Sequence, residues 1–183
     1  QAETPLFDLK NELLKTKQTT QFEFLLRSVS NYASVDQCFK AHTIDVVFHA
    51  AAYKHVYMTE TTPAAAVLNN ILGTKNVVDV AIKNKVAHFV MVSTDKAVNP
   101  SNVMGASKRI AEMYVSNQAE SSNTQLITTR FGNVLGSNGS VVPIFKEQIA
   151  KGGPVTVTHP EITRFFMTIT EACQLVLEAG ATG

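Results

Sequence analysis

Three consecutive side chains with complementary acid–base chemistry, Thr94, Asp95 and Lys96, follow the apolar segment 88–93. A hydroxyl, a carboxylate and an amine can between them accept, donate and relay a proton. In open α/β sheets, ligands bind beyond the carboxyl ends of the strands, so this position favours a functional site. The alternative is an ordinary polar loop, which many tripeptides of this composition form.

A second pair of candidate residues lies eight positions further along the chain. Met104 and Lys108 stand four residues apart at the start of a predicted helix, so both side chains share one helix face. A solvated surface lysine is the usual fate of such a residue. A lysine near a helix N-terminus is disfavoured by the helix dipole, which favours another role for Lys108.

The elements that must position these residues alternate along the chain. Spacing of apolar residues predicts helices and β-branched runs predict strands. Ser34 and Gln37 have the spacing of a capping box for the second helix. The predicted helices cover 5–17, 34–42, 62–84 with an interruption at Gly73, 104–120, 142–151 and 171–179. The predicted strands cover 22–26, 45–49, 88–93 and 126–130, with further short strands near 155 and 165.

This alternation predicts an α/β fold with a doubly wound parallel sheet, as in Rossmann-like proteins. The short β-branched and aromatic run within 45–49 is typical of a strand buried on both faces. The functional residues are then expected just after the strands that end at His49, Ser93 and Arg130.

Composition argues against several other kinds of protein. The chain has 183 residues, with 16 basic and 15 acidic side chains and a net charge of +1. Without a basic patch, nucleic acid is not expected as a partner. The five histidines show no metal-ligand spacing, so no metal is expected. No apolar run approaches the ~20 residues that span a bilayer.

Five collinear motifs together resemble the CapD-like family of extended short-chain dehydrogenases/reductases, the UDP-N-acetylglucosamine 4,6-dehydratases. The resemblance covers nearly the whole chain. The motifs are His49-Ala-Ala-Ala-Tyr-Lys-His55, Ser93-Thr-Asp-Lys-Ala97, Val103-Met-Gly-Ala-Ser-Lys-Arg109, Arg130-Phe-Gly-Asn-Val-Leu-Gly-Ser-Asn-Gly-Ser140, and Gly152-Gly-Pro-Val-Thr-Val-Thr158 with Thr163-Arg-Phe-Phe-Met167.

The resemblance implies a nicotinamide cofactor, NAD or NADP, and a UDP-sugar substrate. Lys108 matches the lysine that binds the cofactor ribose, and Met104 occupies the position of the catalytic tyrosine found in most relatives. The further cofactor-binding positions are Ala50, Ala51, Ala52 and Ser93. The substrate-binding positions are Lys54, His55, Asn133, Thr156 and Arg164. Arg164 is the expected ligand of the diphosphate. For Thr156, an ordinary strand residue without a role in binding is an equally good interpretation.

The implied reaction assigns Asp95 and Lys96 as the acid and base of elimination. Ser93 or Thr94, with Asp95, handles the proton of the C4 hydroxyl, since a thioether at position 104 cannot accept it. Lys96 removes the C5 proton and Asp95 protonates the departing C6 hydroxyl. A proton-donating aspartic acid works best where its surroundings favour the neutral form, so a raised pKa is expected for Asp95.

The resemblance also implies a longer protein. The family begins with a strand and a glycine-rich cofactor loop, which are absent from these residues, so residues 1–183 are expected to form one incomplete NAD(P)-binding domain. Residues 133–183 contribute to the smaller substrate-binding lobe. The full-length protein is expected to be a homo-oligomer and cytoplasmic, or the cytoplasmic part of an inner-membrane protein with a membrane anchor.

Two alternatives stay open. A nucleotide-sugar epimerase or reductase on the same scaffold would be expected to carry tyrosine at position 104 and would not need Asp95 and Lys96. A non-catalytic nucleotide-binding domain would account for the missing tyrosine, but it has no use for an acid–base pair at this position.

Overall fold

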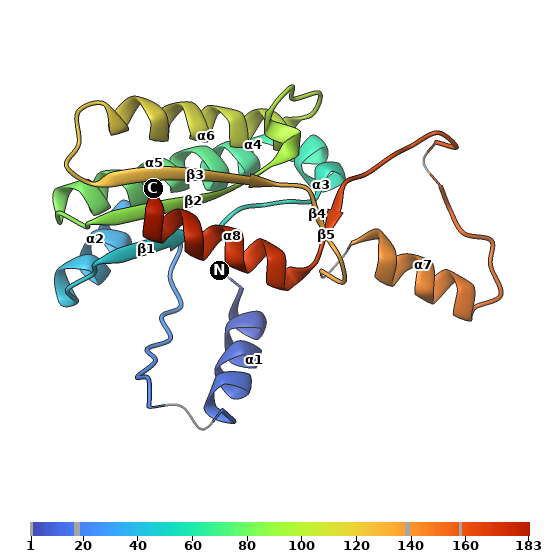
Figure 1. Ribbon diagram of the computed structural model, residues 1–183, viewed down its shortest axis with the longest axis horizontal. Coiled ribbons are helices and arrows are strands. Elements are labelled where there is room, and N and C mark those ends of the chain that lie inside the picture. The colour runs from blue at the N-terminus through green and yellow to red at the C-terminus, as the bar shows by residue number, and fades with distance from the viewer. Residues whose placement is uncertain (1, 17–18, 138–139, 158) are drawn as a thin grey trace.

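The computed structural model of the chain describes residues 2–16, 19–137, 140–157 and 159–183. Its centre is a parallel sheet in the order β1-β2-β3, with helices on both faces (Figure 1). The strands are β1 (Val46–His49), β2 (His88–Thr94) and β3 (Gln125–Phe131). The predicted parallel α/β architecture is confirmed, because the strands pair in parallel and helical segments connect β1 to β2 and β2 to β3.

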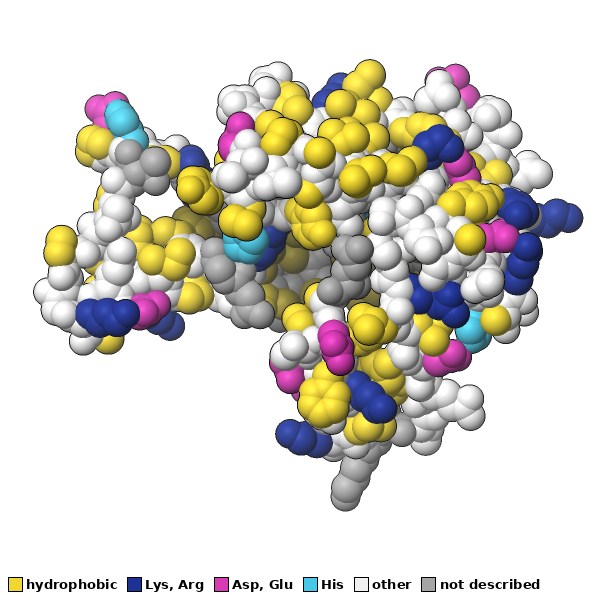
Figure 2. Space-filling model, turned by 180° about the vertical axis from the view of Figure 1, so that it is seen from behind, with side chains coloured by type: hydrophobic (Ala, Val, Ile, Leu, Met, Phe, Trp, Pro, Cys, Tyr) yellow, Lys and Arg dark blue, Asp and Glu magenta, His cyan; other side chains and the backbone are white. Residues whose placement is uncertain are grey.

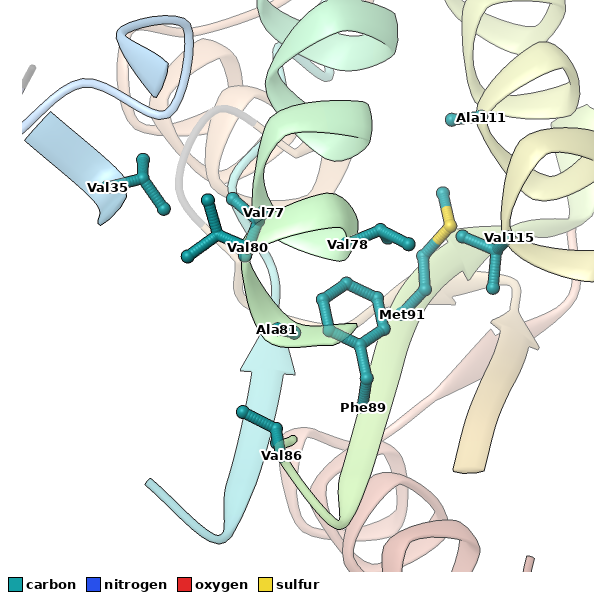
Figure 3. Packing of buried hydrophobic residues seen from close by; sticks show 10 residues of the cluster. All are labelled: Val35, Val77, Val78, Val80, Ala81, Val86, Phe89, Met91, Ala111 and Val115. Atoms are coloured by element: carbon teal, nitrogen blue, oxygen red, sulfur yellow. The ribbon is translucent and has the colours of Figure 1, made fainter. Parts of the chain in front are cut away.

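Helices α2 (Tyr32–Ala41), α5 (Gly73–Lys83) and α6 (Val103–Ala119) cover one face of the sheet, and α8 (Ile169–Thr182) covers the other (Figure 1). The core lies between the sheet and the first group of helices (Figure 3). Phe89 and Met91 of β2 are fully buried there against valines of α5 and α6. This packing holds β2, and therefore its carboxyl end, in a fixed place under α6.

The segment between β1 and α5 is almost continuously helical. It consists of α3 (Val56–Thr61), α4 (Pro63–Ala66) and a π-helical turn (Val67–Leu72) that runs directly into α5. The predicted interruption at Gly73 is therefore wrong. Gly73 instead allows a close approach, since a Cβ there would lie 2.7 Å from Cγ2 of Val29.

The C-terminal part of the chain contains a separate small sheet. Strand β4 (Asn133–Val134) pairs in parallel with β5 (Phe166–Met167), which confirms the strand predicted near residue 165. Between them, α7 (Val141–Ala150) and the segment that follows it stand off from the main body (Figures 1 and 2). The short strand predicted near residue 155 is absent, because no described segment pairs with it.

Two further local predictions are wrong. Segment 22–26 has no regular structure; a strand needs a neighbour for its hydrogen bonds, and none of the described strands lies beside it. Helix α2 is capped by Asn31, whose side chain accepts a hydrogen bond from the Ser34 amide at 3.0 Å. The Ser34 hydroxyl is bonded to Arg27 at 3.1 Å, so it does not serve as the cap.

Strand β1 is less buried than its apolar run predicts. Val46 and Phe48 are 39% and 46% exposed, whereas His49 is buried. The reason is that β1 is the edge strand of this sheet and α8 packs mainly on β2 and β3. Helix α1 (Glu3–Leu14) lies below the sheet and buries no residue completely (Figure 1). None of the helices in the described ranges combines the length and apolar character needed to cross a membrane.

Candidate active site

The parallel register brings the carboxyl ends of β2 and β3 side by side. Ser93 is paired with Arg130, and Thr94 with Phe131. The residues that follow, Asp95 and Lys96 on one side and Asn133 on the other, therefore leave the sheet at the same edge. This is where the sequence predicts the functional residues.

Thr94, Asp95 and Lys96 form a hydrogen-bonded turn at this edge. Thr94 caps a 3₁₀ turn over Asp95–Ala97, and its hydroxyl accepts from the Lys96 amide at 3.4 Å while donating to Oδ1 of Asp95 at 2.9 Å. The ammonium of Lys96 lies 3.0 Å from the same Oδ1. Acid, base and hydroxyl thus form one connected unit rather than three independent loop residues.

Asn133 joins this unit from the end of β3. Its Oδ1 accepts a hydrogen bond from Nζ of Lys96 at 3.0 Å. Lys96 is consequently held between an acidic and an amide oxygen, with a side chain that is 30% exposed. A ligand at the sheet edge can reach this amine.

The expected raised pKa of Asp95 is not found. Partial burial raises this pKa, but hydrogen bonds from Lys96 and Thr94 lower it by more, so the carboxyl titrates below its usual range. The prediction from the resemblance is wrong for this arrangement because the acid and the base are paired directly with each other. In this pairing the Asp95 carboxylate accepts a hydrogen bond from the Lys96 amine, which favours the ionised acid.

Met104 and Lys108 are both only 4% exposed, so Lys108 is not a solvated surface lysine. The Lys108 ammonium donates to the carbonyl oxygen of Val92 at 2.6 Å. Burial lowers the pKa of Lys108 to about 8, although the Glu112 carboxylate opposes this shift. At the edge of the sheet, the Lys108 ammonium is therefore a hydrogen-bond donor with a fixed direction, and it can also lose its charge.

Helix α6 touches the acid–base turn at Gly105. A Cβ on Gly105 would overlap with the carbonyl oxygen of Lys96. Only glycine permits this approach, which sets the first turn of α6 against residues 95–97.

A buried asparagine, missed by the sequence reasoning, fixes the loop after β1. Asn70 is completely buried in the π-helical turn. Its Oδ1 accepts from the Tyr53 amide at 2.7 Å, and its Nδ2 donates to the Tyr53 carbonyl at 3.0 Å and to the Ser107 hydroxyl at 2.9 Å. These bonds tie the alanine loop, Ala50 to Ala52, to the start of α6. The polar pair Asn69-Asn70 within an apolar helix is the feature of the sequence that could have pointed to this residue. The π-helical turn that contains it is a second indication, because such turns often occur at functional sites.

His49 supports the same loop from beneath. Its Nε2 lies 2.9 Å from the Thr74 hydroxyl, which itself donates to the Asn70 carbonyl at 2.6 Å. The hydroxyl can therefore only accept from His49, so the proton is on Nε2. Burial lowers the pKa of His49 to about 4, helped by the nearby Lys108 charge, and the ring is neutral.

The remaining predicted site residues are Lys54, His55, Thr156 and Arg164. Lys54 and His55 are exposed after the alanine loop, with the His55 carbonyl accepting from the Thr59 amide of α3 at 3.1 Å. Thr156 is bonded to Gln148 of α7, and Arg164 donates to the Thr163 carbonyl at 2.9 Å. Thr156 and Arg164 belong to the segment between α7 and β5 that stands off from the main body (Figure 1).

A nicotinamide cofactor fits the residues at this edge. The loop after β1 carries only alanine methyl groups at positions 50–52, which allow a flat ligand to approach the backbone. Lys108 supplies a buried donor beside it. Across the described residues, no group of histidine, cysteine, aspartate and glutamate side chains is arranged to hold a metal ion.

The sequence profile of the polysaccharide biosynthesis protein family matches residues 1–183. The chain belongs to this family. It is 53% identical over 181 residues to the capsular polysaccharide biosynthesis protein CapD of Staphylococcus aureus, an alignment that covers 98% of this chain and 30% of CapD. The resemblance to CapD-like proteins is therefore confirmed. The chain spans about a third of the length of that relative.

The chain is also similar to three further proteins. The chain is 46% identical to the UDP-glucose 4-epimerase of Rickettsia canadensis, covering 87% of this chain and 47% of that protein. The crystal structure of Pen from Bacillus thuringiensis superimposes with a TM-score of 0.91 at 38% identity, covering 99% of this chain and 56% of Pen. The dTDP-glucose 4,6-dehydratase DesIV of Streptomyces venezuelae, solved with NAD, has the same fold, with a TM-score of 0.80 at 17% identity over 90% of this chain and 56% of DesIV.

Proposed function

We propose that these residues form part of the catalytic domain of a nucleotide-sugar 4,6-dehydratase that acts on UDP-N-acetylglucosamine. The cluster of Asp95, Lys96 and Asn133 carries the proposal, because elimination needs an acid and a base on adjacent sugar carbons. The similarity to a UDP-glucose 4-epimerase supports a UDP-sugar as the class of substrate.

A bound NAD or NADP would supply the acceptor for the hydride from sugar C4 and the donor of the hydride to C6, and it would be regenerated in each turnover. Lys108 and the alanine loop would hold it, with Ser93 at the end of β2. Met104 lies on the same face of α6 as Lys108, and its thioether cannot take up a proton. The C4 hydroxyl proton therefore passes to Thr94, whose hydroxyl already donates to Asp95.

The protons of this scheme balance over one turnover. The C4 hydroxyl proton, released when C4 is oxidised, passes through Thr94 to the ionised Asp95 carboxylate, and Lys96 gives up its own proton to solvent, which leaves a neutral acid and a neutral amine. Lys96 then removes the C5 proton, Asp95 protonates the C6 hydroxyl, and water leaves. Lys96 returns its proton to C5 when C6 has received the hydride and then takes up a proton from solvent, which restores the starting state.

Residues 133–183 would contribute to the substrate lobe. Asn133 reaches the sugar from the end of β3, Lys54 and His55 line the cleft, Thr156 contacts the uracil, and Arg164 binds the diphosphate. The position of the segment between α7 and β5 outside the main body supports a role in closing over a ligand (Figure 1).

Incubation of the intact protein with UDP-N-acetylglucosamine in heavy water tests the proposal. We expect a UDP-4-keto-6-deoxy sugar that carries deuterium at C5, because the proton on Lys96 exchanges with solvent. A C4-epimerised sugar without C5 deuterium would instead establish the second candidate, a 4-epimerase, which the relationship to the Rickettsia canadensis epimerase favours.

A further inference from the structure

Helix α6 contains a buried carboxylate that the proposed reaction does not use. Glu112 is 2% exposed. Its Oε1 accepts from the Ser93 hydroxyl at 2.5 Å and from Nε of Arg130 at 2.8 Å, and its Oε2 accepts from a second Arg130 nitrogen at 2.5 Å. Arg109, one turn earlier, adds a longer contact at 3.3 Å.

The two main partners of Glu112 are neighbours in the sheet. Ser93 and Arg130 are paired in register at the carboxyl ends of β2 and β3. Asp95 and Lys96 follow Ser93 by two and three residues, and Asn133 follows Arg130 by three. Glu112 therefore ties together the two strand ends from which the acid–base residues and their amide partner emerge.

The geometry points to Glu112 as a positioning residue that sets the distance between Lys96 and Asn133; this inference rests on the proposed function of that pair. The forked guanidinium of Arg130 gives two bonds in one plane, which fixes direction as well as distance. Gly105 of the same helix lies against the Lys96 carbonyl, so α6 contacts both the turn and, through Glu112, the end of the strand that leads into it. A shift of about 1 Å in such a site typically costs about 100-fold in rate.

The charge of Glu112 is part of this arrangement. Burial raises its pKa, but hydrogen bonds from Arg130 and Ser93 lower it by more, so the carboxylate is ionised. A glutamine at this position has nearly the same shape, but its amide group would turn a donor towards a guanidinium that has no acceptor sites. Glu112→Gln thus loosens the strand ends without removing side-chain volume.

The test measures turnover, ligand binding and structure in the intact protein. For Glu112→Gln we expect kcat to fall about 100-fold while the affinity for UDP, measured by calorimetry, changes by less than about two-fold. A crystal structure of the variant should show the 3.0 Å contact between Lys96 and Asn133 broken. Glu120→Gln, an exposed change at the end of the same helix, is the control and should leave all three readouts unchanged.

The outcomes separate this inference from the proposed function. If the wild type dehydrates the sugar and Glu112→Gln turns over normally, or keeps the Lys96–Asn133 contact, the positioning role is overturned. Parallel losses of kcat, UDP affinity and melting temperature also overturn it, since they indicate a purely structural role. If the wild type makes no 4-keto product but the variant structure loses the contact, the proposed function fails and the positioning role stands.

Arg130→Lys provides a milder version of the same test if Glu112→Gln does not fold. It keeps the positive charge at position 130 but not the forked guanidinium, and we expect kcat to fall about 10-fold.

Discussion

Gly105 lies so close to Lys96 that any Cβ at position 105 would overlap with the Lys96 carbonyl oxygen. The contact joins the first turn of α6 to the turn that carries the acid and the base. Since it involves backbone on both sides, neither partner can yield by a change of rotamer. The arrangement of the site therefore depends on glycine, which has no side chain, at position 105.

Gly105→Ala should consequently lower both stability and turnover. Overpacking of this kind costs about 1–3 kcal/mol in the free energy of unfolding, and the displaced turn would carry Lys96 away from Asn133. Urea denaturation and steady-state kinetics of the intact protein measure the two effects. Gly73→Ala is the matched control: its Cβ would crowd Val29 at 2.7 Å, so it should cost stability without changing kcat. Equal kcat losses in both variants would contradict a local effect at Gly105.

Lys96→Met should abolish dehydration while leaving ligand binding intact. Removal of a positioned base costs about 10²–10⁴-fold in rate, and Lys108 and Arg164 remain to hold the ligands. The measurements are formation of the 4-keto product and incorporation of C5 deuterium from heavy water. Lys151→Met, which removes an exposed lysine paired with Glu147 on α7, should have normal turnover. Near-normal dehydration by Lys96→Met would remove this residue from the mechanism.

Lys108 should make the protein more stable as the pH rises from about 8 towards 10.5. Its pKa is about 8 in the folded chain against 10.5 in the unfolded chain, so the unfolded state binds more protons in this window. The burial penalty at neutral pH, about 3 kcal/mol, is thus relieved on deprotonation.

The comparison of wild type with Lys108→Met isolates this contribution. Both proteins are unfolded with urea at several pH values between 7 and 10.5, and the difference in unfolding free energy is plotted against pH. Other titrating groups, such as Tyr114, are shared and cancel. We expect the difference to shift in favour of the wild type above pH 8; a flat difference would show that the Lys108 pKa is not lowered.

Arg164→Ala should weaken UDP binding to the intact protein by about 2–3 kcal/mol, because a charge-assisted contact to phosphate is lost. In the structure Arg164 is exposed and donates to the carbonyl of its neighbour Thr163, so its removal should leave the melting temperature unchanged. Calorimetric titration with UDP and a thermal melt check the two statements. His159→Ala, on the same segment, serves as the control. Unchanged UDP affinity in Arg164→Ala would exclude this residue from the binding site.

The parallel α/β framework and the location of the acid–base turn follow from the pattern of residues in the sequence alone. Buried strands such as β2 leave a strong apolar pattern, and parallel sheets place functional residues after the strand ends. The segments 88–93 and 126–130 were therefore assigned to within one residue at each end. Segment 22–26 and the cap of α2 were not, because a strand also needs a neighbour and Ser34 had a competing partner in Arg27.

The way the site is held depends on tertiary packing. The bond between Lys96 and Asn133, the anchoring of Tyr53 by Asn70 and the contacts of Glu112 with Ser93 and Arg130 join residues that are 17 to 37 positions apart in sequence. Residue type and spacing do not encode such pairings, since they arise from the register of β2 on β3 and from the packing of α6 across both strands. The lowered pKa of Asp95 also depends on the folded structure. The sequence shows an acid beside an amine, but only the folded turn brings the two side chains into hydrogen-bonding contact.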